Sequence, residues 1–140
     1  GRRLGGPAVK ITADTNVLVR AIVGDDEAQS AVAQATLEQA EEIILALPAL
    51  CELVWVLLKA YQIPPVEVAA AIRRLIQSAN VRVNRPAVEA GLAMLEAGGD
   101  FADGVIAYEG NWLGSEVFVS FDRKAVKLLI AQGGSARVLS

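Results

Sequence analysis

The stretch Glu42-Ile-Ile-Leu-Ala-Leu-Pro48-Ala-Leu-Cys-Glu-Leu-Val-Trp-Val-Leu-Leu-Lys-Ala-Tyr61 contains the pattern from which the fold is predicted. Residues 42–47 are rich in Ile and Leu, which is typical of a short buried strand. Pro48 suits the first turn of a helix, where its missing N–H has no helical partner to lose. We therefore expect a helix at 49–61. A buried strand followed at once by a helix is the building unit of an α/β fold.

The same alternation continues in both directions along the chain. Upstream, we expect a strand at 8–13 and helices at 17–23 and 27–40. Downstream, we expect helices at 66–77, 87–97, 100–112 and 123–132, and strands at 81–83, 116–120 and 137–139. This order predicts a three-layer α/β/α sandwich around a mainly parallel central sheet of four to five strands. No internal boundary is indicated, so residues 8–140 are expected to form one domain after a flexible leader at 1–7.

Composition narrows the possible chemistry. The 140 residues are 54% hydrophobic and 21% charged, as in a globular domain with a substantial core. There is no histidine, and Cys51 is the single cysteine. Catalysis by histidine and zinc sites built on His or Cys are therefore excluded. The single thiol agrees with a cytoplasmic location, and no apolar run is long enough to predict a signal peptide or a membrane span.

Two aspartates directly follow predicted strands. Asp14 comes after the strand at 8–13, and Asp122 comes after the strand at 116–120. Ligands of open α/β sheets bind beyond the carboxyl ends of the strands, so both side chains are expected at one edge of the sheet. Aspartate is also a favoured N-cap, and capping of the next helix is an alternative role for each.

Glu52 is interpreted as an unusual carboxylate within an apolar helix. Its neighbours in Leu50-Cys-Glu-Leu-Val-Trp-Val-Leu-Leu58 are all apolar or weakly polar. Burying a carboxylate without a partner is costly, so we expect a metal ion or a polar cleft beside it. The alternative is that Lys59 or a backbone group satisfies it.

Asp100 and Asp103 lie three residues apart at the expected start of the helix at 100–112. Asp100 suits an N-cap, and Asp103 resembles the acidic residue of a capping box. Because residues three apart share a helix face, Asp103 can also point the same way as the cap. Each acid alone says little, whereas the four acids Asp14, Glu52, Asp103 and Asp122 together indicate an acidic site.

In this order and spacing the motifs resemble those of PIN-domain nucleases. They are Asp14-Thr-Asn16, Glu52 in its apolar helix, Asp100-Phe-Ala-Asp-Gly-Val-Ile-Ala107 and Ser120-Phe-Asp122. The resemblance runs from Val9 to Leu139. Arg20 ahead of Gly24-Asp25-Asp26 and the segment Leu53-Val-Trp-Val56 are similar to the VapC-type toxins of type II toxin–antitoxin systems. Gly104 and Gly110 depart from what a helix favours and suggest close packing.

The resemblance implies a metal-dependent endoribonuclease. Its catalytic metal ligands would be Asp14, Glu52, Asp103 and Asp122, and its supporting residues Asn16, Asp100 and Ser120. Ligands that are all oxygen favour Mg²⁺ or Mn²⁺. Such an ion lowers the pKa of its bound water, and in-line hydrolysis would leave 5′-phosphate and 3′-hydroxyl ends.

The basic residues are candidates for RNA contact despite the net charge of −3. Arg123 and Lys124 stand out, because cations at a helix start oppose the macrodipole. With 5% aromatic residues, recognition of a folded RNA by shape is favoured over base stacking. Toxin kinship implies a transfer RNA or ribosomal RNA target, a homodimer and a cognate antitoxin.

Two other functions remain open from the sequence. An aspartate-nucleophile phosphoryl-transfer enzyme also carries Asp after its first strand, although the phosphatase pattern needs a second Asp where this chain has Asn16. A non-catalytic PIN-like module that binds RNA or protein is the other alternative. The metal chemistry does not require a 2′-hydroxyl, so a DNA substrate also remains possible.

Overall fold

The expected alternation of strands and helices is present in the computed structural model, which describes residues 9–140. The expected leader at 1–7 lies outside the described residues. Contacts within the chain cluster into two units, the first ending at Val83 and the second spanning Asn84–Ser140. The expectation of one nuclease domain over 8–140 stays a prediction.

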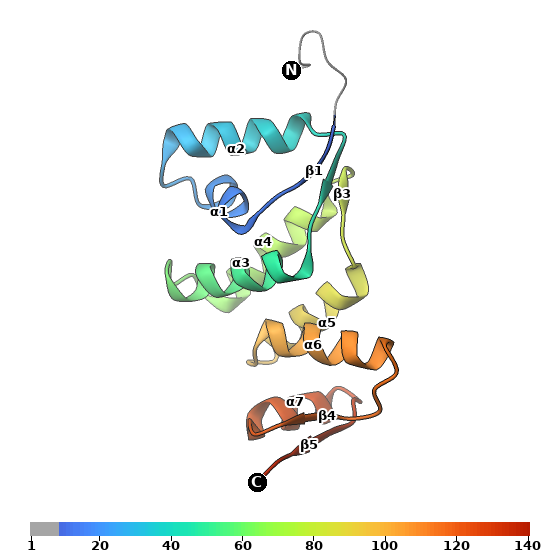
Figure 1. Cartoon of the computed structure of the whole chain (residues 1–140). Helices are drawn as coiled ribbons and strands as arrows, with labels where there is room; N and C mark the ends of the chain where they lie inside the picture. Colours follow the sequence, from blue (N-terminus) through green and yellow to red (C-terminus); the bar gives the residue numbers. More distant parts are fainter. Residues whose placement is uncertain (1–8) are drawn as a thin grey trace. The chain divides into compact units, whose positions relative to one another are not determined.

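The first unit is a parallel three-stranded sheet with four helices. Its elements are β1 (Lys10–Thr12), α1 (Thr15–Val23), α2 (Glu27–Gln39), β2 (Glu42–Ile44), α3 (Leu47–Lys59), α4 (Pro65–Gln77) and β3 (Val81–Arg82). The strand order is β1-β2-β3, and both ladders are parallel. The connections from β1 to β2 and from β2 to β3 run in the same direction across the sheet. Because such crossovers are right-handed, the helices of both connections lie on one face of the sheet. Figure 1 shows α1 to α4 on the same side of these strands.

The two faces of this sheet differ in chemistry because side chains alternate along each strand. Ile43 and Val81 are buried beneath the helices. Glu42 belongs to the other face, where its carboxylate pairs with Lys10 Nζ at 3.7 Å and with Arg82 Nε at 2.8 Å. These pairs join all three strands, but their exposure limits what they add to stability.

The core of the first unit comes from the helices. Leu18 of α1, Leu50 and Leu57 of α3, and Ile72 of α4 are fully buried. Burial of each such side chain stabilises the fold by about 2 kcal/mol. α3 begins at Leu47, two residues before the expected start, and Pro48 occupies its first turn as predicted.

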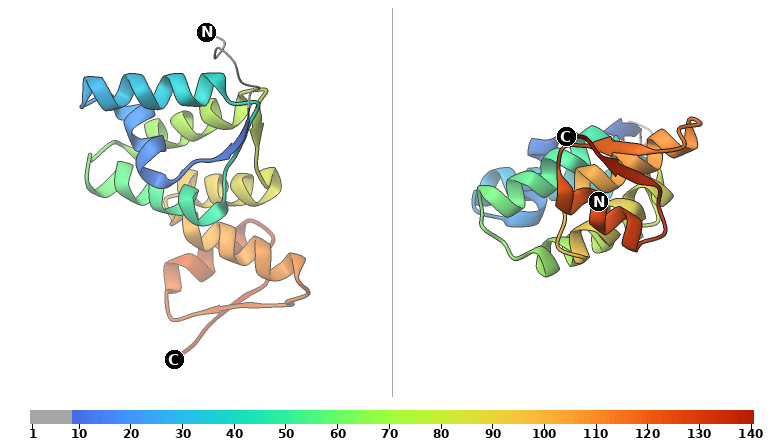
Figure 2. Two further views of the ribbon diagram at one scale, coloured as in Figure 1. Left: turned by 45° about the horizontal axis from the view of Figure 1, so that its top comes forward. Right: turned by 90° about the horizontal axis from the view of Figure 1, so that it is seen from below.

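The second unit pairs a helical hairpin with a small parallel sheet. Its elements are α5 (Arg85–Glu96), α6 (Phe101–Trp112), β4 (Phe118–Ser120), α7 (Arg123–Ala131) and β5 (Ala136–Val138). β4 and β5 are parallel neighbours, and α7 forms the crossover between them. Figure 2 shows α7 alongside this pair of strands.

Glycines allow α5 and α6 to approach closely. A Cβ at Gly91 would lie 2.7 Å from the Phe101 ring, and a Cβ at Gly104 would overlap the carbonyl oxygen of Ala90. The close packing expected at Gly104 is thus confirmed. It does not hold for Gly110, whose nearest neighbour for an added Cβ is Ser115 at an ordinary 3.8 Å.

The predicted α/β class is confirmed, but the single sheet of four to five strands is not. The described residues form one sheet of three strands and one of two. The strands are two or three residues long, so each ladder holds few hydrogen bonds. Each strand pairs with strands of its own unit. The three-layer arrangement stays a prediction; within the first unit, the helices cover one face of the sheet (Figure 1). Among residues 9–140, no helix is both long and apolar enough to cross a bilayer.

Candidate functional site

Asp14 lies between the end of β1 and the start of α1. Its Oδ1 accepts a hydrogen bond of 3.0 Å from the Val17 backbone N–H, so the capping role considered from the sequence is present. That bond uses one carboxylate oxygen and leaves Oδ2 for another ligand. The side chain is exposed, and Asn16, the second residue of α1, is exposed as well. Capping and cation binding are therefore compatible at Asp14.

Glu52 does not have the buried surroundings expected from the sequence. It is exposed, and so are Pro48, Trp55 and Lys59 of the same helix. These positions follow the helical repeat, so they form one stripe along α3, in which Trp55 is 62% exposed. The apolar residues on either side in sequence point elsewhere around the helix. The expected burial of Glu52 was wrong, although its carboxylate remains accessible to a cation.

Thr15 links the helices that carry Asp14 and Glu52. Its Oγ1 lies 3.4 Å from the Ala49 carbonyl oxygen and 3.5 Å from Glu52 Oε1. Thr15 was not among the site residues expected from the sequence. Two features of the sequence could have indicated Thr15 as a site residue: it lies inside Asp14-Thr-Asn16, and its hydroxyl can donate to a carboxylate.

The second unit brings three other aspartates into electrostatic contact. Asp100 and Asp122 are the N-caps of α6 and α7, with bonds of 2.8 Å from Ala102 N–H and 3.1 Å from Ala125 N–H. Asp103 follows in the first turn of α6. Partial burial raises the pKa of Asp103 above its ordinary value of 3.8, and the charges of Asp100 and Asp122 raise it further.

Ser120 and Lys124 lie next to these acids. The Ser120 hydroxyl accepts a 2.9 Å hydrogen bond from the Asp122 backbone N–H, which fixes the turn between β4 and α7. Arg123 and Lys124 are exposed in the first turn of α7. A Cβ at Gly98 would lie 4.0 Å from Lys124 Nζ, so this ammonium group is beside the turn that leads to Asp100.

The predicted acids thus fall into two sets, each within one unit. Asp14 and Glu52, with Thr15, make up the first; Asp103 and Asp122, with Asp100, make up the second. Among residues 9–140, no three His, Cys, Asp or Glu side chains are arranged to hold a metal ion. The expectation that all four predicted ligands serve one site stays a prediction.

The donor chemistry of both sets fits a hard divalent cation. Every side chain in them offers carboxylate or hydroxyl oxygen, the kind of ligand that Mg²⁺ and Mn²⁺ prefer. Partial burial, and after it the negative charges of Asp100 and Asp122, raise the pKa of Asp103. A cation would relieve this repulsion, as carboxylates that share a site otherwise tend to take up protons.

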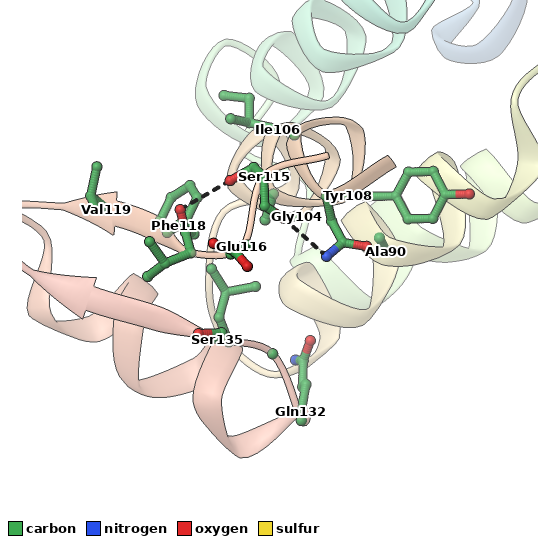
Figure 3. A pocket seen from close by; sticks show the side chains of 17 residues that line it. Ala90, Gly104, Ile106, Tyr108, Ser115, Glu116, Phe118, Val119, Gln132 and Ser135 are labelled. Carbon is green, nitrogen blue, oxygen red and sulfur yellow. Dashed lines mark hydrogen bonds between the residues drawn. The ribbon is translucent and has the colours of Figure 1, made fainter. Parts of the chain in front are cut away.

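A separate pocket of about 600 Å³ lies in the second unit, between α6, β4 and the end of α7. Figure 3 shows Tyr108, Ser115, Glu116 and Gln132 at its edges. Ser115 Oγ donates to the Val117 carbonyl at 3.2 Å, and Asn111 Nδ2 donates to the Ser115 carbonyl at 3.4 Å. Glu116 is the charged residue of its lining, and none of the predicted site residues belongs to it. The pocket is therefore distinct from both acidic sets.

Comparison with known families identifies the class of protein that these features define. The model of the PIN domain matches residues 11–128, a span that contains all four predicted ligands and parts of both units. The chain therefore belongs to the PIN-domain family. PIN domains are commonly nucleases and generally use a divalent metal. A search of the curated proteins gives no match.

Proposed function

We propose that this PIN-domain protein is a Mg²⁺- or Mn²⁺-dependent endoribonuclease and the toxin of a toxin–antitoxin pair. The observation that carries the nuclease proposal is the grouping of Asp100, Asp103 and Asp122, where partial burial and then the charges of Asp100 and Asp122 raise the pKa of Asp103. Burial and repulsion of this kind cost stability when a carboxylate has no partner, whereas a bound cation would offset both. Family membership supports the same reaction class.

In this proposal the carboxylates of both sets serve one hydrolytic reaction. Asp14, Glu52, Asp103 and Asp122 bind the cation, and Asn16, Asp100 and Ser120 support them. A bound divalent ion supplies a water molecule of lowered pKa and stabilises charge on the phosphoryl oxygens. Asp14 and Asp122 are held by their helix caps, so each presents its second oxygen without first having to become ordered. The products are 5′-phosphate and 3′-hydroxyl ends.

The proposed substrate is a structured RNA, a transfer RNA or a ribosomal RNA loop. Arg123 and Lys124 would contact its phosphates, since both are exposed directly after Asp122. Local cations matter more for binding the RNA backbone than the overall charge of −3. The toxin role, a cognate antitoxin and a homodimer are proposed from the resemblance of Arg20, Gly24-Asp25-Asp26 and Leu53-Val-Trp-Val56 to VapC-type toxins.

The test is cleavage of a total-RNA pool by the purified chain with Mg²⁺, with Mn²⁺ and with EDTA. Asp14→Asn is the diagnostic variant, because Asn still caps a helix but loses the charge. Asp26→Asn is the matched control, since Asp26 caps α2 through a 3.1 Å bond to Gln29 N–H and lies outside both sets. We expect discrete RNA fragments that require metal and Asp14 and are unaffected in Asp26→Asn. Equal cleavage by Asp14→Asn and the wild-type protein would reject the proposed role of Asp14.

A non-catalytic PIN-like binding module is the second candidate. It is favoured by the finding that no three acidic side chains among residues 9–140 are arranged to hold a metal ion. The same experiment separates the two functions. RNA binding without cleavage in either metal, from protein shown to be free of a bound inhibitor, would support the binding module.

A further inference from the structure

The Thr15 hydroxyl has two acceptors on α3 but one proton to give. Ala49 O is at 3.4 Å and Glu52 Oε1 at 3.5 Å, and residues three apart share a helix face, so both acceptors lie on the same side of α3. Both distances are long for a hydroxyl donor, whose bonds normally measure about 2.7–2.8 Å. A small rotation of either side chain therefore decides which acceptor takes the proton.

The two acceptors are not equivalent. The Ala49 carbonyl lies inside α3, where Leu53 N–H is its regular helical donor. The Glu52 carboxylate is charged and exposed, and hydrogen bonds to a charged acceptor are stronger than neutral ones. A hydrogen bond from the hydroxyl to Glu52 is therefore stronger than one to the Ala49 carbonyl, which already has a donor.

We propose that Thr15 is a positioning residue that holds Glu52 Oε1 beside the start of α1 and leaves Oε2 for the cation. The inference rests on the proposed function, because it gives Thr15 a role in the same metal-dependent reaction. Thr15 follows Asp14 directly in the chain, so a carboxylate held by Thr15 stays beside the start of α1, where Asp14 is the N-cap. Without the hydroxyl, Glu52 would explore its other rotamers on the exposed stripe of α3.

The experiment measures Mn²⁺ binding to the full chain by calorimetry, without RNA. The variants are Thr15→Val, which replaces the hydroxyl by a methyl group, and Thr15→Ser, which keeps it. Thr36→Val is the matched control, because Thr36 donates at 2.8 Å to the Val32 carbonyl within α2, apart from both acidic sets. Glu52→Ala and the double variant Thr15→Val/Glu52→Ala complete a double-mutant cycle.

We expect Thr15→Val to weaken Mn²⁺ binding about tenfold, as loss of a hydrogen bond to a metal ligand commonly does. Thr15→Ser should restore most of the affinity, and Thr36→Val should bind as the wild-type protein does. In the Glu52→Ala background, Thr15→Val should cause no further loss. An equal loss in both backgrounds would overturn the inference, because Thr15 would then act through Ala49 and helix packing. Unchanged affinity in Thr15→Val would overturn it as well.

A metal-free measurement separates this inference from the proposed function. The same cycle is repeated by urea unfolding in EDTA, where a Thr15–Glu52 hydrogen bond should appear as a favourable coupling. No coupling in EDTA would reject the contact, whatever the metal data show. Intact coupling in a wild-type protein that binds no Mn²⁺ and cleaves no RNA would reject both the proposed function and the positioning role. The contact would then be purely structural.

Discussion

The backbone of Gly104 in α6 lies against the carbonyl oxygen of Ala90 in α5, at a distance that leaves no room for a Cβ. A Gly104→Ala chain must separate the two helices or distort one of them. We expect this variant to lose about 1–3 kcal/mol of unfolding free energy, the usual cost of overpacking. Urea unfolding followed by circular dichroism measures the loss.

Gly110→Ala is the natural control for that prediction. Gly110 lies in the same helix, but an added Cβ there meets Ser115 at an ordinary 3.8 Å. Alanine favours helix over glycine by up to about 1 kcal/mol, so this variant should be more stable than the wild-type protein. If both alanine variants shifted the urea midpoint equally, the close approach at Ala90 would not be responsible.

Replacing Asp103 should stabilise the metal-free protein at neutral pH. Because its pKa is raised in the folded state, the folded chain holds the proton more tightly than the unfolded chain. Stability therefore falls as pH rises from about the ordinary value of 3.8 through the raised value. Asp103→Asn removes this dependence. Since Asp103 is only partly buried, solvent screening limits the effect, and we expect a gain in Tm of about 1–2 °C at pH 7 in EDTA and none at pH 3.

Thermal unfolding at several pH values measures this effect, with Glu109→Gln, exposed on the same helix, as the control. A lower Tm for Asp103→Asn at pH 7 in EDTA would contradict the raised pKa of Asp103, which partial burial and the charges of Asp100 and Asp122 cause.

Divalent metal should stabilise the wild-type protein more than variants that lack a proposed metal ligand. Binding to the folded state alone stabilises it by about 2.7 kcal/mol when the free ion is at 100 times its Kd. We expect Mn²⁺ to raise the Tm of the wild-type protein and to have a weaker effect on Asp14→Asn and Asp122→Asn. Asp26→Asn should respond as the wild-type protein does. An equal response in all four proteins would mean that the ion binds elsewhere.

The Tyr61 hydroxyl should control the pKa of Asp25. Tyr61 donates a 3.0 Å hydrogen bond to Asp25 Oδ2, and Arg20 pairs with Oδ1 at 3.0 Å. The Tyr61 bond lowers the pKa of Asp25 most, while Arg20 lowers it further. In Tyr61→Phe the pKa should therefore move up toward the ordinary value. An NMR titration of the Asp25 carboxyl carbon measures the shift, with Tyr108→Phe as the control; an unchanged pKa would show that the Tyr61 hydrogen bond does not lower it.

Lys124 should contribute to RNA affinity more than to the chemical step. Lys124→Gln is expected to raise KM and to leave kcat nearly unchanged, because it removes an exposed cation beside the acids. The slope of log affinity against log salt should fall by about 0.7 for each phosphate that the protein no longer neutralises. Lys127→Gln, exposed one turn further along α7, is the matched control. A larger change in RNA affinity for Lys127→Gln than for Lys124→Gln would mean that the RNA contacts Lys127 and not Lys124.

The order of elements and the capping aspartates could be predicted from the sequence because they depend on local interactions. Pro48 begins α3 and Gly24 ends α1 through the conformations that these residues favour. Asp14, Asp100 and Asp122 cap their helices through bonds to N–H groups two or three residues away. Such interactions span one turn, so a single segment contains the information that specifies them.

Tertiary structure decided what depends on segments far apart in the chain. The exposure of Glu52 followed from which side of α3 packs inward, and an apolar composition on both sides of Glu52 did not reveal it. The contact between Thr15 and Glu52 spans 37 positions. The charge of Asp122, which comes from another element, adds to the burial and to the charge of Asp100 that raise the pKa of Asp103. The order of the motifs in the sequence was enough to indicate the family. The distances between side chains are set only when helices pack, because packing fixes which helix faces meet.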